Sequence, residues 1–318
     1  MTQRNLTSPL TFEPLFMERV WGGRRLETQF GRRLPPATRI GESWEIVDRP
    51  EAQSVVHLGP LRGCTLHDLW TKHRRDIFGE NIPDSERFPL LLKLIDADAK
   101  LSLQVHPPPS VATALGSEAK SEFWLIAAAA PDAEIYAGLR AGVSRKQFED
   151  ALASGAAADC VHRLRVRAGD AIFMPSGRLH AIGAGNVIVE IQQNSDTTYR
   201  VFDWNRTGLD GKPRKLHIDE SLQSIDFEDV EPALLHPEEE SLVDDSLFRI
   251  ERWRLDSERD AVPPGEFAIF FCVSGEVECS GLRAKIGEFF LIPASLTDRK
   301  LKPLTQSTVL LRTTVTPL

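Results

Sequence analysis

The 318-residue sequence predicts a mainly β protein that contains two related β-barrel units and a few helices. Two observations lead to this fold class. Most of the chain consists of short apolar segments bounded by Gly, Pro or Asn, as is typical of strands joined by turns. In addition, the segment Gly169-Asp-Ala-Ile-Phe-Met-Pro175 is echoed by Gly287-Glu-Phe-Phe-Leu-Ile-Pro293, with the glycine and the proline equally far apart.

The expected elements follow from local patterns. The strands that we expect are Ser43–Val47, Leu90–Leu94, Leu101–Val105, Phe123–Ala127, Ala171–Met174, Val187–Ile191, Phe248–Leu255 and Phe267–Val273. Two segments predict helices instead: Thr65 is suited to cap a helix that ends at Gly79, and Ser144-Arg-Lys-Gln matches a capping box before a helix that ends at Gly155. We interpret both helices as packing elements.

An acidic, proline-containing segment divides the chain. Residues 228–246 predict an exposed connection between a first unit at residues 1–227 and a second unit at residues 247–318. In the first unit Pro175 is followed by His180, whereas Pro293 is followed by Ala-Ser-Leu-Thr-Asp298, without a histidine. We therefore expect the first unit to carry the chemistry and the second to be a degenerate copy.

The bulk composition limits the function. A net charge of -8 argues against nucleic acid as a partner, and an anionic substrate then needs a local cluster of Lys and Arg. The four cysteines are scattered without a CxxC pair, which favours free thiols in a reducing compartment. Neither a leader peptide nor a membrane-spanning run is recognisable, so we expect a cytoplasmic protein without a membrane partner.

The strongest local signal is Gly169-x5-Pro175-x-Gly177-x2-His180. It predicts a glycine turn, an apolar strand, a second turn and a histidine that enters the next strand. A lone histidine is as often structural as it is a metal ligand. The spacing, however, resembles the second motif of the cupin barrel, in which this histidine binds metal. The usual asparagine of that motif has no match at Ala184, and Asn186 is displaced.

Two further clusters have side chains that alternate along strands. Ser102, Gln104 and His106 share one face of their strand, which is either solvent-exposed or lines a cavity. The apolar run Phe88–Ile95 before it favours the cavity. Lys120 and Glu122 also share a face, and taken alone they would be an exposed ion pair worth under ~1 kcal/mol.

Together these clusters offer one candidate metal site. Gln104, His106, Glu122 and His180 are a nitrogen and oxygen set that suits Zn²⁺ or another divalent ion. The set contains no thiolate, which argues against a closed structural site and favours a catalytic site with an open coordination position.

The order of the motifs resembles a known family. The strings WGGRRL, GESWEIVDRP, QVHPPP, SEFWLI, MPSGRLHAIG, VIVEIQQNSDTTYRVFDWNR and KLHIDESL are similar to those of type I mannose-6-phosphate isomerases in their short bacterial form. The similarity covers most of residues 12–225. It implies cupin-type double-stranded β-helix (jelly-roll) barrels, a metal-binding one and a degenerate C-terminal one.

The resemblance also implies roles for individual residues. One zinc per chain is held by Gln104, His106, Glu122 and His180. Active-site and substrate-binding positions fall on Lys93, Ser102, Lys120, Glu190, Asp196 and Arg200. Without the resemblance, Arg200 and Lys93 would be interpreted as a surface cation and a lysine that packs its stem against apolar neighbours.

The expected reaction is the zinc-dependent interconversion of mannose 6-phosphate and fructose 6-phosphate through a cis-enediol(ate). Arg200, Lys93 and Lys120 are expected to share phosphate binding and oxyanion stabilisation. Glu190 or Asp196 is the candidate for proton transfer, with a lysine or a metal-bound water as alternatives. The rival hypotheses are another metal-dependent cupin enzyme and a non-catalytic, sugar-phosphate-binding regulatory cupin. The expected assembly is a monomer or a homodimer.

Overall fold

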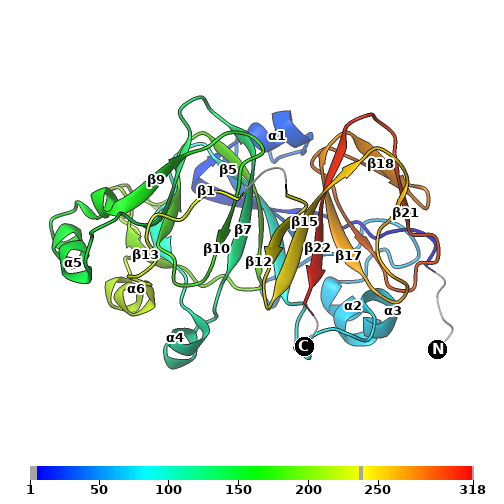
Figure 1. Ribbon diagram of the computed structural model, residues 1–318, viewed down its shortest axis with the longest axis horizontal. Helices are drawn as coiled ribbons and strands as arrows, with labels where there is room; N and C mark the ends of the chain where they lie inside the picture. Colours follow the sequence, from blue (N-terminus) through cyan, green and yellow to red (C-terminus); the bar gives the residue numbers. More distant parts are fainter. Residues whose placement is uncertain (1–5, 236–238, 317–318) are drawn as a thin grey trace.

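The computed structural model describes residues 6–235 and 239–316. Residues 1–5, 236–238 and 317–318 lie outside the described residues. They include the start of the N-terminal segment in which no leader was recognised, part of the predicted connection and the end of the predicted second unit. Figure 1 shows two β-sandwiches side by side, with the N-terminal strands in one and the last strands, in orange and red, in the other.

The first sandwich consists of two antiparallel sheets. The six-stranded sheet has, in spatial order, β1 (Leu15–Gly23), β2 (Ile40–Ile46), β5 (Leu90–Ala97), β12 (Asn186–Gln193), β7 (Glu122–Ala129) and β10 (Ala171–Met174). The five-stranded sheet has β13 (Tyr199–Phe202), β6 (Leu103–Val105), β11 (His180–Ile182), β8 (Glu134–Leu139) and β9 (Val161–Arg165). A short hairpin, β3 (Asp48–Arg49) with β4 (Ala52–Gln53), accompanies them.

The second sandwich repeats the arrangement on a smaller scale. Its five-stranded sheet has β14 (Ser241–Asp244), β15 (Phe248–Leu255), β22 (Thr308–Val315), β17 (Ala268–Ser274) and β20 (Phe289–Ile292). Its four-stranded sheet has β16 (Arg259–Asp260), β21 (Lys300–Pro303), β18 (Glu276–Cys279) and β19 (Leu282–Lys285). The predicted fold class, mainly β with a few helices, is confirmed.

The helices are short and peripheral (Figure 1). They are α1 (Arg25–Phe30), α2 (Leu66–Lys72), α3 (Arg74–Phe78), α4 (Pro109–Ala114), α5 (Arg145–Ala153) and α6 (Ile218–Ser224), with a 3₁₀ turn at Ala157–Cys160. The capping box at Ser144 is formed, and Thr65 caps α2 through Asp68 N. The predicted helix from Thr65 to Gly79 is broken at His73 into α2 and α3. None of the described helices is long and apolar enough to cross a bilayer.

The predicted strands lie within three residues of the observed ones. Ala171–Met174 and Phe248–Leu255 have the expected bounds. β14 begins at Ser241, inside the segment predicted as a connection, and Leu235 of that segment forms a bridge with Ala171. The connecting chain therefore runs along the first sandwich before it enters the second.

Alternation along the central strands separates two faces. On β7, Phe123 and Leu125 belong to one apolar core, whereas Trp124 belongs to another that fills the interior of the first sandwich. Because successive side chains of a strand point to opposite faces, Glu122 shares the interior face with Trp124. The same reasoning places Lys93 of β5 and Glu190 of β12 on the interior face.

The two sandwiches are joined by a common apolar core. Leu92 and Val189 from the first sandwich and Ile269, Phe271 and Leu311 from the second belong to one cluster of buried residues. The outer face of the six-stranded sheet thus packs on the five-stranded sheet of the second sandwich, and this core fixes the sheet that carries the interior site.

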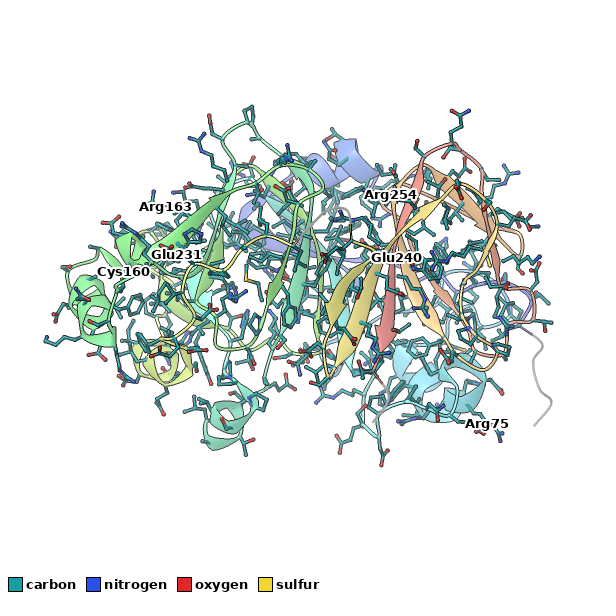
Figure 2. All side chains as sticks on the ribbon, in the orientation of Figure 1. Arg75, Cys160, Arg163, Glu231, Glu240 and Arg254 are labelled. Atoms are coloured by element: carbon teal, nitrogen blue, oxygen red, sulfur yellow. The ribbon has the colours of Figure 1, made fainter. Side chains whose placement is uncertain are left out.

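The cysteines do not form disulfides within the described chain. Cys64, Cys160, Cys272 and Cys279 are free thiols, and all but Cys64 are buried. Cys160 lies at the α5 end of the first sandwich, where Figure 2 labels it close to Arg163 and Glu231. Burial raises the pKa of the Cys272 and Cys279 thiols to about 12, so these two cysteines are interpreted as structural.

The common core yields a stability prediction. Leu311→Ala removes a fully buried side chain from it and is expected to lower the free energy of unfolding by about 3 kcal/mol. Leu304→Ala, at a position that is 43% exposed, is expected to change it by less than about 0.5 kcal/mol. Urea unfolding followed by circular dichroism measures both, and equal effects would contradict the common core.

Candidate metal centre and active site

The predicted ligands lie on facing strands of the first sandwich. His180 is the first residue of β11 and pairs directly with Gln104 of β6. His106 follows the end of β6, and Glu122 is the first residue of β7 in the opposite sheet. Residues from sequence positions 104 to 180 thus meet at one end of the sandwich interior.

The two imidazoles and the carboxylate are within reach of a single ion. His106 Nε2 lies 3.0 Å from Glu122 Oε1, and His180 Nε2 lies 3.9 Å from Glu122 Oε2. The ligand atoms of the three residues lie within 4.8 Å of one another, and each residue is 1% exposed. The two distances to the Glu122 oxygens are close to those between atoms that share a zinc ion with bonds of about 2.0–2.2 Å.

Backbone carbonyls orient both imidazoles. His106 Nδ1 donates to Thr197 O at 2.8 Å, and His180 Nδ1 donates to Arg178 O at 2.9 Å. These bonds place the proton of each neutral ring on Nδ1 and leave Nε2 as a lone-pair donor. This is the second layer of contacts that metal-binding histidines usually have.

The chemistry of these atoms fits a divalent cation. His106 Nε2 and Glu122 Oε2 are buried without a hydrogen bond, and Glu122 Oε1 is paired with the Lys120 ammonium. Buried polar atoms are nearly always hydrogen-bonded, because an unsatisfied one costs about 1–3 kcal/mol and more if it is charged. A cation between the two residues would satisfy both of the unpaired atoms at once.

Gln104 lies at the cluster with its amide turned the other way. Its Nε2 lies 3.3 Å from His180 Nε2, while its Oε1 accepts a hydrogen bond from Ser102 Oγ. An amide nitrogen does not bind zinc, so Gln104 can serve as a ligand only after a half-turn of the carboxamide. That turn exchanges the two atoms and lets Nε2 donate to Ser102.

Two lysines are buried beside the cluster. Lys120 Nζ lies 2.7 Å from Glu122 Oε1, and Lys93 Nζ lies 3.1 Å from Glu190 Oε1. Lys120 is 4% exposed and Lys93 is 3% exposed. Lys120 is therefore not part of an exposed ion pair, and Lys93 does not extend its ammonium group to the solvent. Glu190 also accepts a hydrogen bond from Trp124 Nε1 at 3.0 Å.

Burial and mutual charge shift the ionisation of the cluster. Burial lowers the pKa of His106 to about 3, helped by the Lys120 charge, and burial also lowers the pKa of His180. Although burial opposes it, Lys120 and then His106 hold the pKa of Glu122 well below its usual range. Burial and the Glu122 charge raise the pKa of Glu190. Neutral imidazoles and an ionised Glu122 are the states that bind metal.

Arg200 and Asp196 lie differently with respect to the site. Arg200 of β13 pairs with Gln104, so that His180, Gln104 and Arg200 form one row across three strands. Its Nη1 donates to Lys215 O at 2.9 Å. Asp196 is exposed in the loop before β13, from where its charge acts on Lys120.

Some residues of the site escape sequence reasoning. The carbonyls of Thr197 and Arg178 carry no sequence signal, because any residue supplies a carbonyl. Trp124 could have been found, since it lies two positions after Glu122 on the same face. Although burial opposes it, Lys93 and Arg19 lower the pKa of Glu42 to about 2, and this partly buried carboxylate extends the charged cluster to β2.

The second sandwich has different residues at the equivalent positions. Met174 of β10 and Ile292 of β20 occupy the same position of the repeated segment, one residue before its proline. Met174 pairs with Glu122 and Ile292 pairs with Ala268, so Ala268 is the counterpart of Glu122. By the same registers Arg312 replaces Glu190 and Glu251 replaces Lys93.

The mouth of the second sandwich is a cavity with these exchanged charges. It measures about 430 Å³, and its lining includes Glu251 and Arg312, which form an ion pair. No group of three metal-binding side chains lies there among residues 239–316. The second sandwich therefore repeats the strand arrangement of the first but not its metal-binding side chains.

A jelly-roll sandwich with two histidines and a carboxylate at its mouth defines the class as a cupin-type protein with a candidate metal centre. Comparisons with known proteins specify the family. Residues 10–125 match the family described as phosphomannose isomerase type I, catalytic domain. The chain is 36% identical to mannose-6-phosphate isomerase ManA of Bacillus subtilis over 93% of its own length and 96% of that protein. The chain belongs to the type I phosphomannose isomerase family, as its motifs suggested.

Solved structures agree with this membership. The crystal structure of the mannose 6-phosphate isomerase from Bacillus subtilis matches with a TM-score of 0.83 and 30% identity over 96% of this chain and 99% of that one. A mannose 6-phosphate isomerase bound with zinc and yttrium matches with a TM-score of 0.72 over 97% of this chain and 100% of that one. At 17% identity the second match supports the fold alone.

The geometry predicts which residues hold the metal. Purified wild-type protein incubated with Zn²⁺ and then desalted is expected to retain about one zinc per chain, whereas Glu122→Gln and His180→Ala retain much less. Asp196→Asn, in the exposed loop, is the matched control and keeps the metal. Elemental analysis measures the ratio, and full zinc content in His180→Ala would contradict the assignment.

Proposed function

We propose that this chain interconverts mannose 6-phosphate and fructose 6-phosphate at the site formed by His106, Glu122 and His180. The observation that carries the proposal is the buried ligand cluster with Lys120 in contact with it, in a chain similar over nearly its whole length to mannose-6-phosphate isomerases. A coupled assay of the purified protein with mannose 6-phosphate tests it, with glucose 6-phosphate as the comparison.

Zinc is the proposed metal, held by His106, Glu122, His180 and the turned Gln104. Imidazole, carboxylate and amide donors suit zinc, and a structurally similar isomerase is bound with zinc. When bound, zinc polarises substrate oxygens and stabilises negative charge that develops on them. Treatment with a chelator is expected to abolish activity, and added zinc to restore it.

Cationic side chains are proposed to bind the anionic parts of the substrate. Arg200 projects from the same row as Gln104, and its Nε is buried without a hydrogen bond. A guanidinium can form two parallel bonds to a phosphate or an enediolate. Lys120 supplies a fixed charge beside Glu122, and Ser102 a hydroxyl. Lys93, which contacts Glu190, is proposed to act on the substrate through that carboxylate.

Glu190 is the proposed proton carrier. The aldose-to-ketose step moves one proton from C2 to C1 and one from the C2 hydroxyl to the C1 oxygen, and the carboxylate that carries the first ends in its starting state. A buried carboxylate with a raised pKa suits this shuttle, because its pKa lies closer to the working pH. Exposed Asp196 lacks these surroundings, so it is the weaker of the two carboxylate candidates.

The chemistry is assigned to residues 1–227, with residues 228–246 as the connection and residues 247–318 as a degenerate cupin-like domain. The exchange of Glu122 for Ala268 at the equivalent position supports this division. A regulatory cupin would be expected to have lost part of the ligand and cation set. In this chain every ligand and cation position that the family motifs indicate is present.

Arg200 is expected to be essential for turnover. Arg200→Ala should lower kcat/KM for mannose 6-phosphate by about 100-fold, as happens when a donor to a developing negative charge is removed. Zinc content should remain at the wild-type level, because Arg200 is not a ligand. The control is Arg145→Ala on the exposed face of α5, which should leave kcat/KM unchanged. A wild-type kcat/KM in Arg200→Ala would refute the assignment.

The two carboxylates can be distinguished directly. Glu190→Gln is expected to lower kcat by about 100-fold or more, in the range that general acid–base catalysis contributes. Asp196→Asn is expected to change kcat by less than about threefold. Thermal melts identify any loss of folding that results from leaving Lys93 without its partner. The reverse order of effects would transfer the role to Asp196.

A further inference from the structure

Arg200 lies on an edge strand, which alone would hold it loosely. β13 has β6 on one side, and no strand of the described residues pairs with its opposite side. The free edge of Arg200 is covered by residues 215–217. His217 N donates to Arg200 O at 2.8 Å, and Arg200 N donates to His217 Nδ1 at 3.1 Å. A third bond joins Arg200 Nη1 to Lys215 O.

We propose that His217 is a positioning residue for Arg200, and that its neutral imidazole forms a clamp that opens when the ring is protonated. The inference rests on the proposed function, in which Arg200 binds the substrate. Because His217 takes both backbone groups of Arg200, Arg200 and Gln104 form a non-hydrogen-bonded pair. Facing side chains come closest in such pairs, so the Arg200 side chain leaves β13 on the same face of the sheet as Gln104.

The start of α6 fixes His217 in turn. His217 O accepts hydrogen bonds from Ser221 N at 2.9 Å and from Ser221 Oγ at 2.5 Å. Ser221 is fully buried, so this anchor is rigid. The imidazole also lies 6.0 Å from the Tyr199 ring. With the ring held in this way, Nδ1 accepts the bond from Arg200 and the proton of the neutral ring resides on Nε2.

The surroundings of His217 favour the neutral ring. Burial and the charges of Arg200 on β13 and Lys215 in the loop lower the pKa of His217, whereas Glu220 on α6 opposes this shift. The Tyr199 ring also lies against the imidazole. A protonated Nδ1 would point a donor at the Arg200 amide, which is also a donor. The clamp is therefore closed at neutral pH and opens as the pH falls through the lowered pKa.

Two substitutions separate the acceptor from the rest of the ring. In His217→Asn, Oδ1 is bonded to Cγ just as Nδ1 is, and it accepts a hydrogen bond without titrating. His217→Ala removes the acceptor. His162→Ala, on β9 in the same sheet, controls for loss of a half-exposed histidine. Zinc content and thermal melts are measured for every variant.

The expected results are specific to a clamp. His217→Ala should lower kcat/KM for mannose 6-phosphate by about tenfold, as the loss of one hydrogen bond would. His217→Asn should recover most of it and should lose less activity than wild type between pH 7 and pH 5. Equal impairment of the two variants at full zinc content, or identical pH profiles of His217→Asn and wild type, would overturn the proposal.

A second measurement does not depend on catalysis. Amide hydrogen exchange at Arg200 should be faster in His217→Ala than in wild type and unchanged in His217→Asn and His162→Ala. Equal exchange in His217→Ala and wild type would overturn the clamp even in an active enzyme. A wild-type protein inert toward mannose 6-phosphate would instead refute the proposed function, and the exchange result would still decide the contact.

Discussion

The burial of the Glu122 carboxylate between two imidazoles and an ammonium is the constraint on which the rest of the site depends. A carboxylate that is 1% exposed can stay ionised only if positive charge compensates it. Lys120 supplies one positive charge, and the two histidines with Glu122 offer the ligand atoms for a metal cation that would supply another. The alternating strands place these groups inward while their neighbours Phe123 and Leu125 form the core between the sandwiches.

The site divides its tasks between rigid and peripheral elements. The strands β5, β12 and β7 lie in the middle of the six-stranded sheet, packed on both faces, and carry Lys93, Glu190 and Glu122. Arg200 lies on an edge strand and depends on a loop and the start of α6 for its position. The second sandwich shows that the same frame accepts other charges, since Arg312 and Glu251 occupy the equivalent positions. The fold therefore sets the geometry, and individual side chains set the chemistry.

Sequence patterns predicted the fold class and the candidate ligands, because both depend on local signals. The period of two placed Gln104 and His106 on one face, and the repeat revealed the second sandwich. The break at His73 carried no such signal, since apolar residues continue through it at helical spacing. The hydrogen bonds of Thr197 O, Arg178 O and His217 depend on contacts between distant segments, which alternation cannot indicate. Nor could it show that Lys93 contacts Glu190, because strand order was unknown.

X-ray absorption at the zinc edge of the zinc-loaded protein tests the central claim most directly, because it reports the atoms around the ion. The account predicts nitrogen and oxygen neighbours at about 2.0–2.2 Å, with the outer-shell scattering of two imidazole rings. A sulfur neighbour at about 2.3 Å, or a shell without imidazole scattering, would contradict it.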